Sequence, residues 1–196
     1  NTKGLSLKYA TERNLICLDS AGMQTPVYYY EKKLMDRYGL AKQDIKKNND
    51  IKLEMLNDRT LTDIFIQDFI LEVSEVIIIV VGALCQNDQK LIERISSRYG
   101  AKKKIIIVHN FSTLLKNNDI ESKIERDITE AFDVIERPII DQETGDTGLR
   151  EYIEKNNDKN KGNISHLVLG AEKQESGMKW NAKTLDYLKK ILDTLV

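Results

Sequence analysis

Continuous apolar runs alternate with amphipathic segments along most of the chain. The run "LSLKYA" (5–10) alternates apolar and polar residues, which predicts a half-buried strand, and "TERN" turns it into a hairpin with the next run. Four further runs are continuously apolar, as strands covered on both faces are: "LICLD" (15–19), "EVIIIVVG" (75–82), "KKKIIIVHN" (102–110) and "ISHLVLG" (164–170). The pattern therefore predicts five strands.

Helical periodicity fills the intervals between these runs. Predicted helices cover 27–39 and 87–100, each ended by a glycine, and Asn87 is the expected cap of the second. A third begins at Thr60, whose spacing from Asp63 fits a capping box, and runs to about Ser74. Two apolar stripes predict the remaining helices, one at 120, 124, 128 and 132, the other from about 181 at 185, 188, 192 and 195. Segment 40–58 is read as an exposed excursion or a partly helical insertion, and 137–163 as a loop region with room for a short helix.

Buried strands that alternate with amphipathic helices predict an α/β fold with a mostly parallel sheet and helices on both faces. No internal repeat and no second domain is evident, so residues 1–196 are predicted to form one domain. Ligands of such sheets bind beyond the carboxyl ends of the strands. This rule directs attention to Asp19, Gly82, His109 with Asn110, and Gly170.

Composition narrows the function classes. The net charge of −1 and pI of about 6.2 give no overall field that points to nucleic acid or to an acidic partner. Cys17 and Cys85 lie in or beside apolar runs, so they are expected to be reduced core residues of a cytoplasmic protein. The longest apolar run, 76–84, is too short to cross a bilayer, and the sequence shows no signal peptide.

The turn after the second run has the form of a phosphate and metal site. Asp19-Ser20-Ala21-Gly22 reads D-x-x-G, in which the acid can hold Mg²⁺ and the glycine amide can approach a phosphate oxygen closely. The same four residues are also compatible with an ordinary capped turn. The motifs around this turn bear on the choice.

The order of motifs resembles the GTPase domain of the dynamin superfamily, especially its guanylate-binding-protein and atlastin branch. Thr2-Lys3-Gly4 matches the T-x-G of the first switch, and "ICLDSAG" matches the strand that ends in D-x-x-G. "DFILEVSEVIIIVVG" follows as a helix and strand, "IIIVHNF" as the strand with the base-reading motif, and "SHLVLG" with "NAKTLDYLKKIL" as the closing strand and helix. The resemblance implies a P-loop-NTPase-like, doubly wound, mostly parallel sheet with one antiparallel edge hairpin.

The resemblance also implies a ligand and a set of site residues. Mg²⁺ would be held by Thr2 and Asp19, the γ-phosphate of GTP would meet Gly22, and Asn110 beside His109 would read the base. Gly170 and Ala171 stand where the family's loop packs over the base. Gln24 is the candidate for orienting the attacking water, because Met23 occupies the position directly after D-x-x-G. The family often dimerises across its nucleotide face, so a homodimer is expected.

Two departures from the family pattern qualify these expectations. No G-x-x-x-x-G-K-[ST] occurs, so the phosphate loop, with the first strand and helix, would have to precede residue 1. The chain is therefore expected to be an N-terminally incomplete domain that binds little or no GTP by itself. His109-Asn110 also replaces the Arg-Asp of the resembled branch. An amide at Asn110 would turn its NH₂ toward a guanine donor, which weakens guanine preference.

Three functions remain open at this point. The first is GTP binding and Mg²⁺-dependent hydrolysis by a GTPase domain of which this chain is a part. The second is a pseudo-GTPase that binds partner proteins without turnover, which the absent phosphate loop favours. In the third, the chain is an unrelated α/β domain and the DSAG stretch is only a turn.

Overall fold

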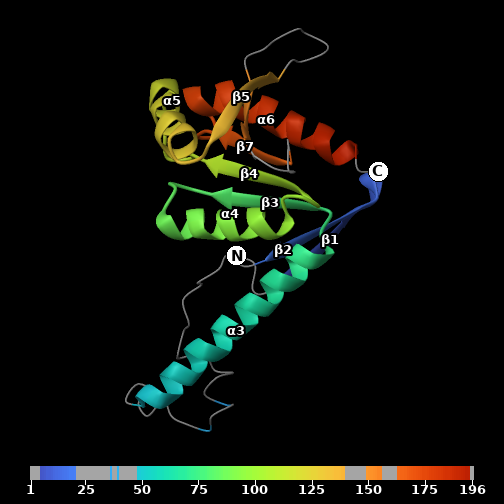
Figure 1. Ribbon diagram of the computed structural model, residues 1–196, viewed down its shortest axis with the longest axis vertical. Helices are drawn as coiled ribbons and strands as arrows, with labels where there is room; N and C mark the ends of the chain where they lie inside the picture. The colour runs from blue at the N-terminus through green and yellow to red at the C-terminus, as the bar shows by residue number, and fades with distance from the viewer. Residues whose placement is uncertain are drawn as a thin grey trace. The chain divides into compact units, whose positions relative to one another are not determined.

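The computed structural model describes residues 5–20, 36, 39, 48–139, 149–155 and 163–194. The chain divides into two compact units, Asn1–Ser74 and Glu75–Val196. Figure 1 shows the elements of each unit. Whether the two units belong to a single domain, as the sequence predicts, stays a prediction.

The first unit contains a hairpin and a long helix. Strands β1 (Leu5–Ala10) and β2 (Leu15–Ser20) pair antiparallel, and the 3-10 turn η1 (Thr11–Arg13) joins them. Asn14 completes the turn with a left-handed φ of 49°, a conformation that asparagine adopts more readily than most residues. The predicted hairpin is thereby confirmed. Cys17, which the sequence predicts to lie in the core, is exposed on β2.

Helix α3 (Asn49–Val73) begins eleven residues before the predicted start at Thr60. The side-chain oxygen of Asn48 accepts the amides of Asp50 and Ile51, so the cap lies here. The Thr60 hydroxyl donates instead to the carbonyl of Leu56, as a threonine inside a helix does. The capping-box prediction was therefore wrong, and residues 49–58 of the polar segment that preceded it are helical. Of the predicted helix at 27–39, only Asp36 and Gly39 are described.

The second unit is built on a five-stranded sheet in the order β3-β4-β7-β6-β5. Its strands are β3 (Val76–Val81), β4 (Lys104–Asn110), β5 (Val134–Ile139), β6 (Leu149–Glu154) and β7 (Ile164–Leu169). The β3–β4 and β4–β7 pairs are parallel, whereas β7–β6 and β6–β5 are antiparallel. The predicted apolar strands at 75–82, 102–110 and 164–170 are thus confirmed as strands, but β3 is not covered on both faces, because Ile78 is 44% and Val80 64% exposed.

The prediction of a doubly wound, mostly parallel sheet was wrong. Three of the five described strand pairs are antiparallel, and the β1–β2 hairpin forms a sheet of its own. The cause is the pair β5 and β6, which lie largely within 137–163, the segment predicted to be a loop region. β5 carries Pro138 and three exposed residues before it, a composition that suits a sheet edge but hides the strand from an apolar pattern.

Three helices accompany this sheet. Helix α4 (Gln86–Tyr99) confirms the predicted helix, although Cys85 and not Asn87 occupies the cap, with the Asp88 carboxylate accepting the Cys85 amide. Helix α5 (Asn117–Ile124) continues into a π-helical turn, η2 (Glu125–Thr129). In Figure 1, α4 lies beside β3, and α5 and α6 lie at the β7 side of the sheet. Cys85 is exposed, so the prediction that the cysteines are core residues was wrong at both positions.

Helix α6 (Glu175–Asp193) begins about six residues before its predicted start. Leu188 and Ile191 pack against Ile106, Val108 and Leu167 on one face of the sheet. The predicted stripe of leucines is only partly correct, because Leu185 is 49% exposed. A second core cluster joins α5, η2, α6 and the sheet: Phe111, Ile120, Ile124, Ile128, Leu149, Tyr152, Val168 and Trp180.

Candidate functional site at the carboxyl edge of the parallel strands

The parallel strands bring several of the predicted site residues to one edge. Asn110, the last residue of β4, pairs with Leu169, the last residue of β7, and the amide of Phe111 donates to the Leu169 carbonyl at 2.8 Å. Asn110 therefore lies beside Gly170 and Ala171, which follow directly in the chain. Its side chain is exposed, whereas Phe111 after it is 3% exposed. A solvent-facing carboxamide beside a strand-to-helix loop offers one acceptor oxygen and two N–H donors to a ligand.

The loop from β7 to α6 is held tightly by its own hydrogen bonds. The Gly170 amide donates to Asn181 Oδ1 at 2.8 Å, and the Gly170 carbonyl accepts from Asn181 Nδ2. The Ala171 amide donates to Ser176 Oγ at 3.0 Å, and that hydroxyl donates on to the Leu114 carbonyl. The amides of Gly170 and Ala171 are therefore engaged within the protein and are not free to donate to a ligand.

Two glycines permit the close approach of this loop to α6. A Cβ at Gly170 would come within 2.6 Å of the Ser176 carbonyl carbon, and a Cβ at Gly177 within 2.1 Å of the Ala171 oxygen. Lys173 between them has a left-handed φ of 62°. Gly82, at the end of β3, differs because a Cβ there would meet nothing within 4 Å. The glycine at position 170 is thus explained by backbone packing alone.

His109 lies in the interior of the unit rather than on the edge. Its ring is 0% exposed, stacks on His166 with centroids 5.3 Å apart, and lies 5.8 Å from the Phe111 ring. Its Nε2 is 3.0 Å from His166 Nδ1, and His166 Nε2 is 3.1 Å from Glu154 Oε1. Burial first, and His166 second, lower the pKa of His109 to about 3, so the ring is neutral at pH 7. A nucleotide-contacting role for His109 stays a prediction.

The residues predicted for the metal and the γ-phosphate belong to the first unit. Asp19 is exposed on β2 opposite Ser6, and its carboxylate is a suitable oxygen ligand for Mg²⁺. Thr2, Gly22 and Gln24 lie outside the described residues. Among the residues that the structure describes, no group of three His, Cys, Asp or Glu side chains is arranged to hold a metal ion.

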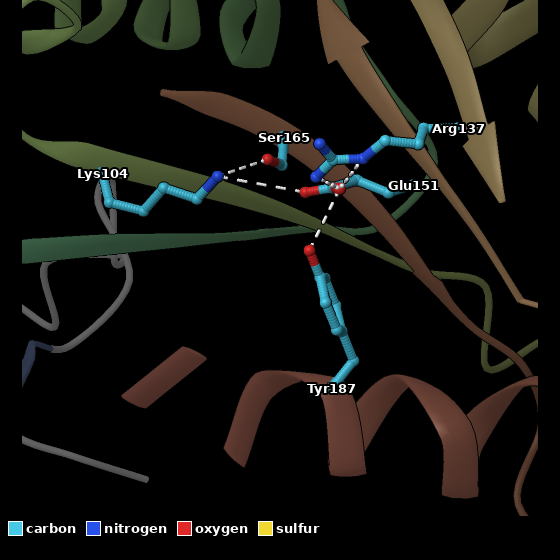
Figure 2. Close-up of polar contacts among 5 residues, drawn as sticks. All are labelled: Lys104, Arg137, Glu151, Ser165 and Tyr187. Atoms are coloured by element: carbon cyan, nitrogen blue, oxygen red, sulfur yellow. Dashed lines mark hydrogen bonds and ion pairs between the residues drawn. The ribbon is translucent and has the colours of Figure 1, made fainter. Parts of the chain in front are cut away.

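A second polar cluster occupies the opposite end of β4, where Figure 2 shows Glu151 among four other polar side chains. Its members are Lys104, Arg137, Glu151, Ser165 and Tyr187. The Glu151 side chain is 0% exposed, Arg137 pairs with Oε2, the Tyr187 hydroxyl donates to Oε2 at 3.0 Å, and Lys104 Nζ lies 3.9 Å from Oε1. Hydrogen bonds and nearby cations keep the pKa of Glu151 below its usual value although burial acts to raise it.

The chemistry of this cluster is structural. Lys104 Nζ donates to Ser165 Oγ at 2.8 Å, and burial lowers the pKa of Lys104. A lysine with a lowered pKa beside a serine hydroxyl is also found where a lysine activates a serine nucleophile. Ser165 is 0% exposed, however, so no substrate can reach its hydroxyl. The cluster joins β4, β5, β6, β7 and α6 through one buried carboxylate. Sequence reasoning missed it because Glu151 is separated from every partner by at least 14 residues.

A helix suitable for crossing a membrane is not found among the described residues. No protein-family model matches the chain, and no curated protein or solved structure is significantly similar to it.

Proposed function

We propose that this chain is the base-recognising and magnesium-binding part of a guanylate-binding-protein-like GTPase domain of the dynamin superfamily. The native protein would bind GTP with Mg²⁺ and hydrolyse the γ-phosphate. The observation that carries the proposal is the pairing of Asn110 with Leu169, which puts an exposed carboxamide beside Gly170 and Ala171 at the carboxyl ends of adjacent parallel strands. In this proposal Asp19 and Thr2 serve the metal, Gly22 the phosphate and Gln24 the water.

The base preference follows from the hydrogen-bonding groups of Asn110. Its Oδ1 can accept one N–H of guanine, but its Nδ2 is a donor and meets the 2-amino donor of that base. A base with oxygen at the 2-position, as in xanthine, offers Nδ2 an acceptor instead. The proposal therefore expects the native protein to bind XTP more tightly than GTP.

The test measures the binding of GTP, XTP and ATP, each with Mg²⁺, by the native protein at its full length. Asn110→Asp replaces the donor by a second acceptor, which can pair with the 2-amino group of guanine. The substitution should therefore raise the ratio of GTP to XTP affinity about tenfold or more, the effect of one polar group left unpaired. Asn118→Asp is the matched control, because Asn118 is also exposed but lies on α5. An unchanged ratio, or no nucleotide binding by either form, refutes base recognition at Asn110.

Hydrolysis and metal binding need their own variants. Asp19→Asn should raise the Mg²⁺ concentration needed for GTP binding, and Gln24→Ala should slow phosphate release at saturating GTP. Binding of GTP without phosphate release would identify a pseudo-GTPase, which binds partners without turnover. If Asp19→Asn left nucleotide affinity unchanged, the DSAG stretch would be only a turn.

We further propose a cytoplasmic protein that forms a homodimer through its nucleotide face and does not bind nucleic acid. Both cysteines are free and exposed thiols, which suits a reducing compartment. The net charge of −1 gives no electrostatic attraction to phosphate backbones. Sedimentation with and without nucleotide tests the dimer, and a mass that does not change with nucleotide contradicts it.

A further inference from the structure

Three side chains from three neighbouring strands form a hydrogen-bonded chain beneath the carboxyl edge. Glu154 belongs to β6, His166 to β7 and His109 to β4. The distance from Glu154 Oε1 to His166 Nε2 is 3.1 Å, and from His166 Nδ1 to His109 Nε2 it is 3.0 Å. Both rings are 0% exposed, and the Glu154 side chain is 17% exposed. This hydrogen-bonded series of Glu154, His166 and His109, here called the relay, thus runs from a partly exposed carboxylate to a fully buried ring.

The carboxylate determines where the ring protons lie. A carboxylate only accepts hydrogen bonds, so His166 Nε2 must carry a proton. In a neutral His166 ring, Nδ1 is then the acceptor, and His109 Nε2 must donate to it. Since His109 holds only one proton at pH 7, its Nδ1 carries a lone pair. That atom is buried and has no hydrogen-bond partner among the described residues.

His109 directly precedes Asn110 at the end of β4. Asn110 stands between two buried rings, His109 before it and Phe111 after it. The Phe111 amide donates to the Leu169 carbonyl at 2.8 Å, which ties this strand end to β7. His109 is bound to β7 as well, through His166. The strand end is therefore joined to β7 on both sides of Asn110, once by a backbone and once by a side-chain hydrogen bond.

We propose that Glu154, acting through His166, is a positioning residue that holds His109 in its Nε2–H tautomer and so fixes the backbone of Asn110 at the edge. Its consequence for a bound guanine base rests on the proposed function above. The tautomers and the order of the strand end do not depend on that function, because they are properties of the ligand-free unit. The two parts of the inference can therefore be tested separately.

The first experiment records ¹⁵N spectra of the histidine rings in the full chain at pH 7. Wild type should show both rings neutral and protonated on Nε2. Glu154→Met keeps the chain length but removes the acceptor, so a large share of both rings should switch to Nδ1–H, whereas Glu154→Gln, which keeps Oε1, should retain the wild-type tautomers. Asp133→Asn is the control, because Asp133 pairs with neighbouring Lys155 outside the relay. An imidazolium at His166 in wild type, or unchanged tautomers in Glu154→Met, overturns the inference.

The second experiment measures hydrogen exchange of the Phe111 amide. Glu154→Met should accelerate its exchange about fivefold to tenfold, the size expected for the loss of one supporting hydrogen bond, and Glu154→Gln should restore the wild-type rate. The tautomer switch without faster exchange shows that the relay does not position the strand end, and so overturns the inference.

The third experiment measures the ratio of GTP to XTP affinity in the same variants of the native protein. Positioning of Asn110 predicts that Glu154→Met moves this ratio toward one and that Glu154→Gln does not change it. If Glu154→Met leaves the ratio at its wild-type value, the positioning of the base by the relay is refuted. A protein that binds no nucleotide refutes the proposed function, while faster Phe111 exchange in Glu154→Met still supports the relay.

Discussion

His109 and His166 stack on adjacent parallel strands, and Nε2 of the first lies 3.0 Å from Nδ1 of the second. Two imidazoles that share a hydrogen bond without solvent are stable only while at least one ring stays neutral. The pair therefore couples the interior of the sheet to pH.

Stability should fall as the pH drops from 6.5 toward 3. Burial lowers the pKa of His109 from 6.5 to about 3, so in this window the unfolded chain binds a proton that the folded chain does not. The free energy of unfolding should lose about 1.4 kcal/mol per pH unit below 6.5 from this residue, and nothing from it above 6.5. Urea denaturation at pH 7, 6 and 5 measures the slope.

His109→Gln is the matched variant for this measurement, since its side-chain NH₂ can still donate to His166 but does not titrate. Its slope between pH 6.5 and 5 should be smaller than that of wild type by about 1.4 kcal/mol per unit. Equal slopes would show that His109 titrates normally in the folded protein.

Glu151→Gln should destabilise the five-stranded unit. The substitution removes the negative charge of the carboxylate that faces Arg137 and Lys104 and that accepts a hydrogen bond from the Tyr187 hydroxyl. Because Arg137 is half exposed and can recruit water, the cost should be about 2 to 3 kcal/mol rather than the full penalty of a broken buried pair. Urea denaturation monitored by the fluorescence of buried Trp180 measures it.

Glu136→Gln supplies the comparison, because Glu136 pairs with Arg150 on the exposed surface of the same sheet. An exposed pair contributes up to about 1 kcal/mol. Equal losses in the free energy of unfolding for Glu151→Gln and Glu136→Gln would contradict the structural role of Glu151.

Gly177→Ala should destabilise the chain although alanine is the better helix former. A Cβ at this position of α6 would lie 2.1 Å from the Ala171 carbonyl oxygen, and both groups are backbone-bound and cannot move aside cheaply. The steric cost of about 1 to 3 kcal/mol should exceed the gain in helix propensity of about 1 kcal/mol. Gly82→Ala, with open space around it, should change stability by less than about 0.5 kcal/mol. Similar melting temperatures for the two variants would contradict the packing of the loop on α6.

Both cysteines should react with a thiol reagent in the folded protein. Cys17 and Cys85 are exposed, on β2 and at the start of α4, and neither is in a disulfide. Two thiols per chain should titrate without denaturant, and Cys17→Ser and Cys85→Ser should each remove one. Reaction only after unfolding would mean that the thiols are buried, as the apolar pattern alone suggests.

Local patterns are sufficient where one element buries one continuous or periodic set of side chains. Strands β3, β4 and β7 and helix α4 are predictable for this reason, because every residue that identifies them lies within the element. The position of Asn110 and Gly170 at the carboxyl edge also follows from sequence, since carboxyl ends of parallel strands meet at one edge, whereas their adjacency depends on the pairing of β4 with β7.

Elements whose polar residues are stabilised by distant partners cannot be read this way. β6 places Glu151 in the core, where Arg137, Tyr187 and Lys104 surround it. In the sequence alone, a glutamate at this position suggests an exposed loop residue. The relay likewise joins His109 to a partner 57 residues away and His166 to one 12 residues away. The sequence by itself determined the parallel strands and the residues at their ends, because the apolar residues of each strand are consecutive in the sequence. Only the tertiary structure decided the antiparallel half of the sheet and the buried polar contacts, because a buried charge or imidazole is tolerated only with partners that the fold brings together.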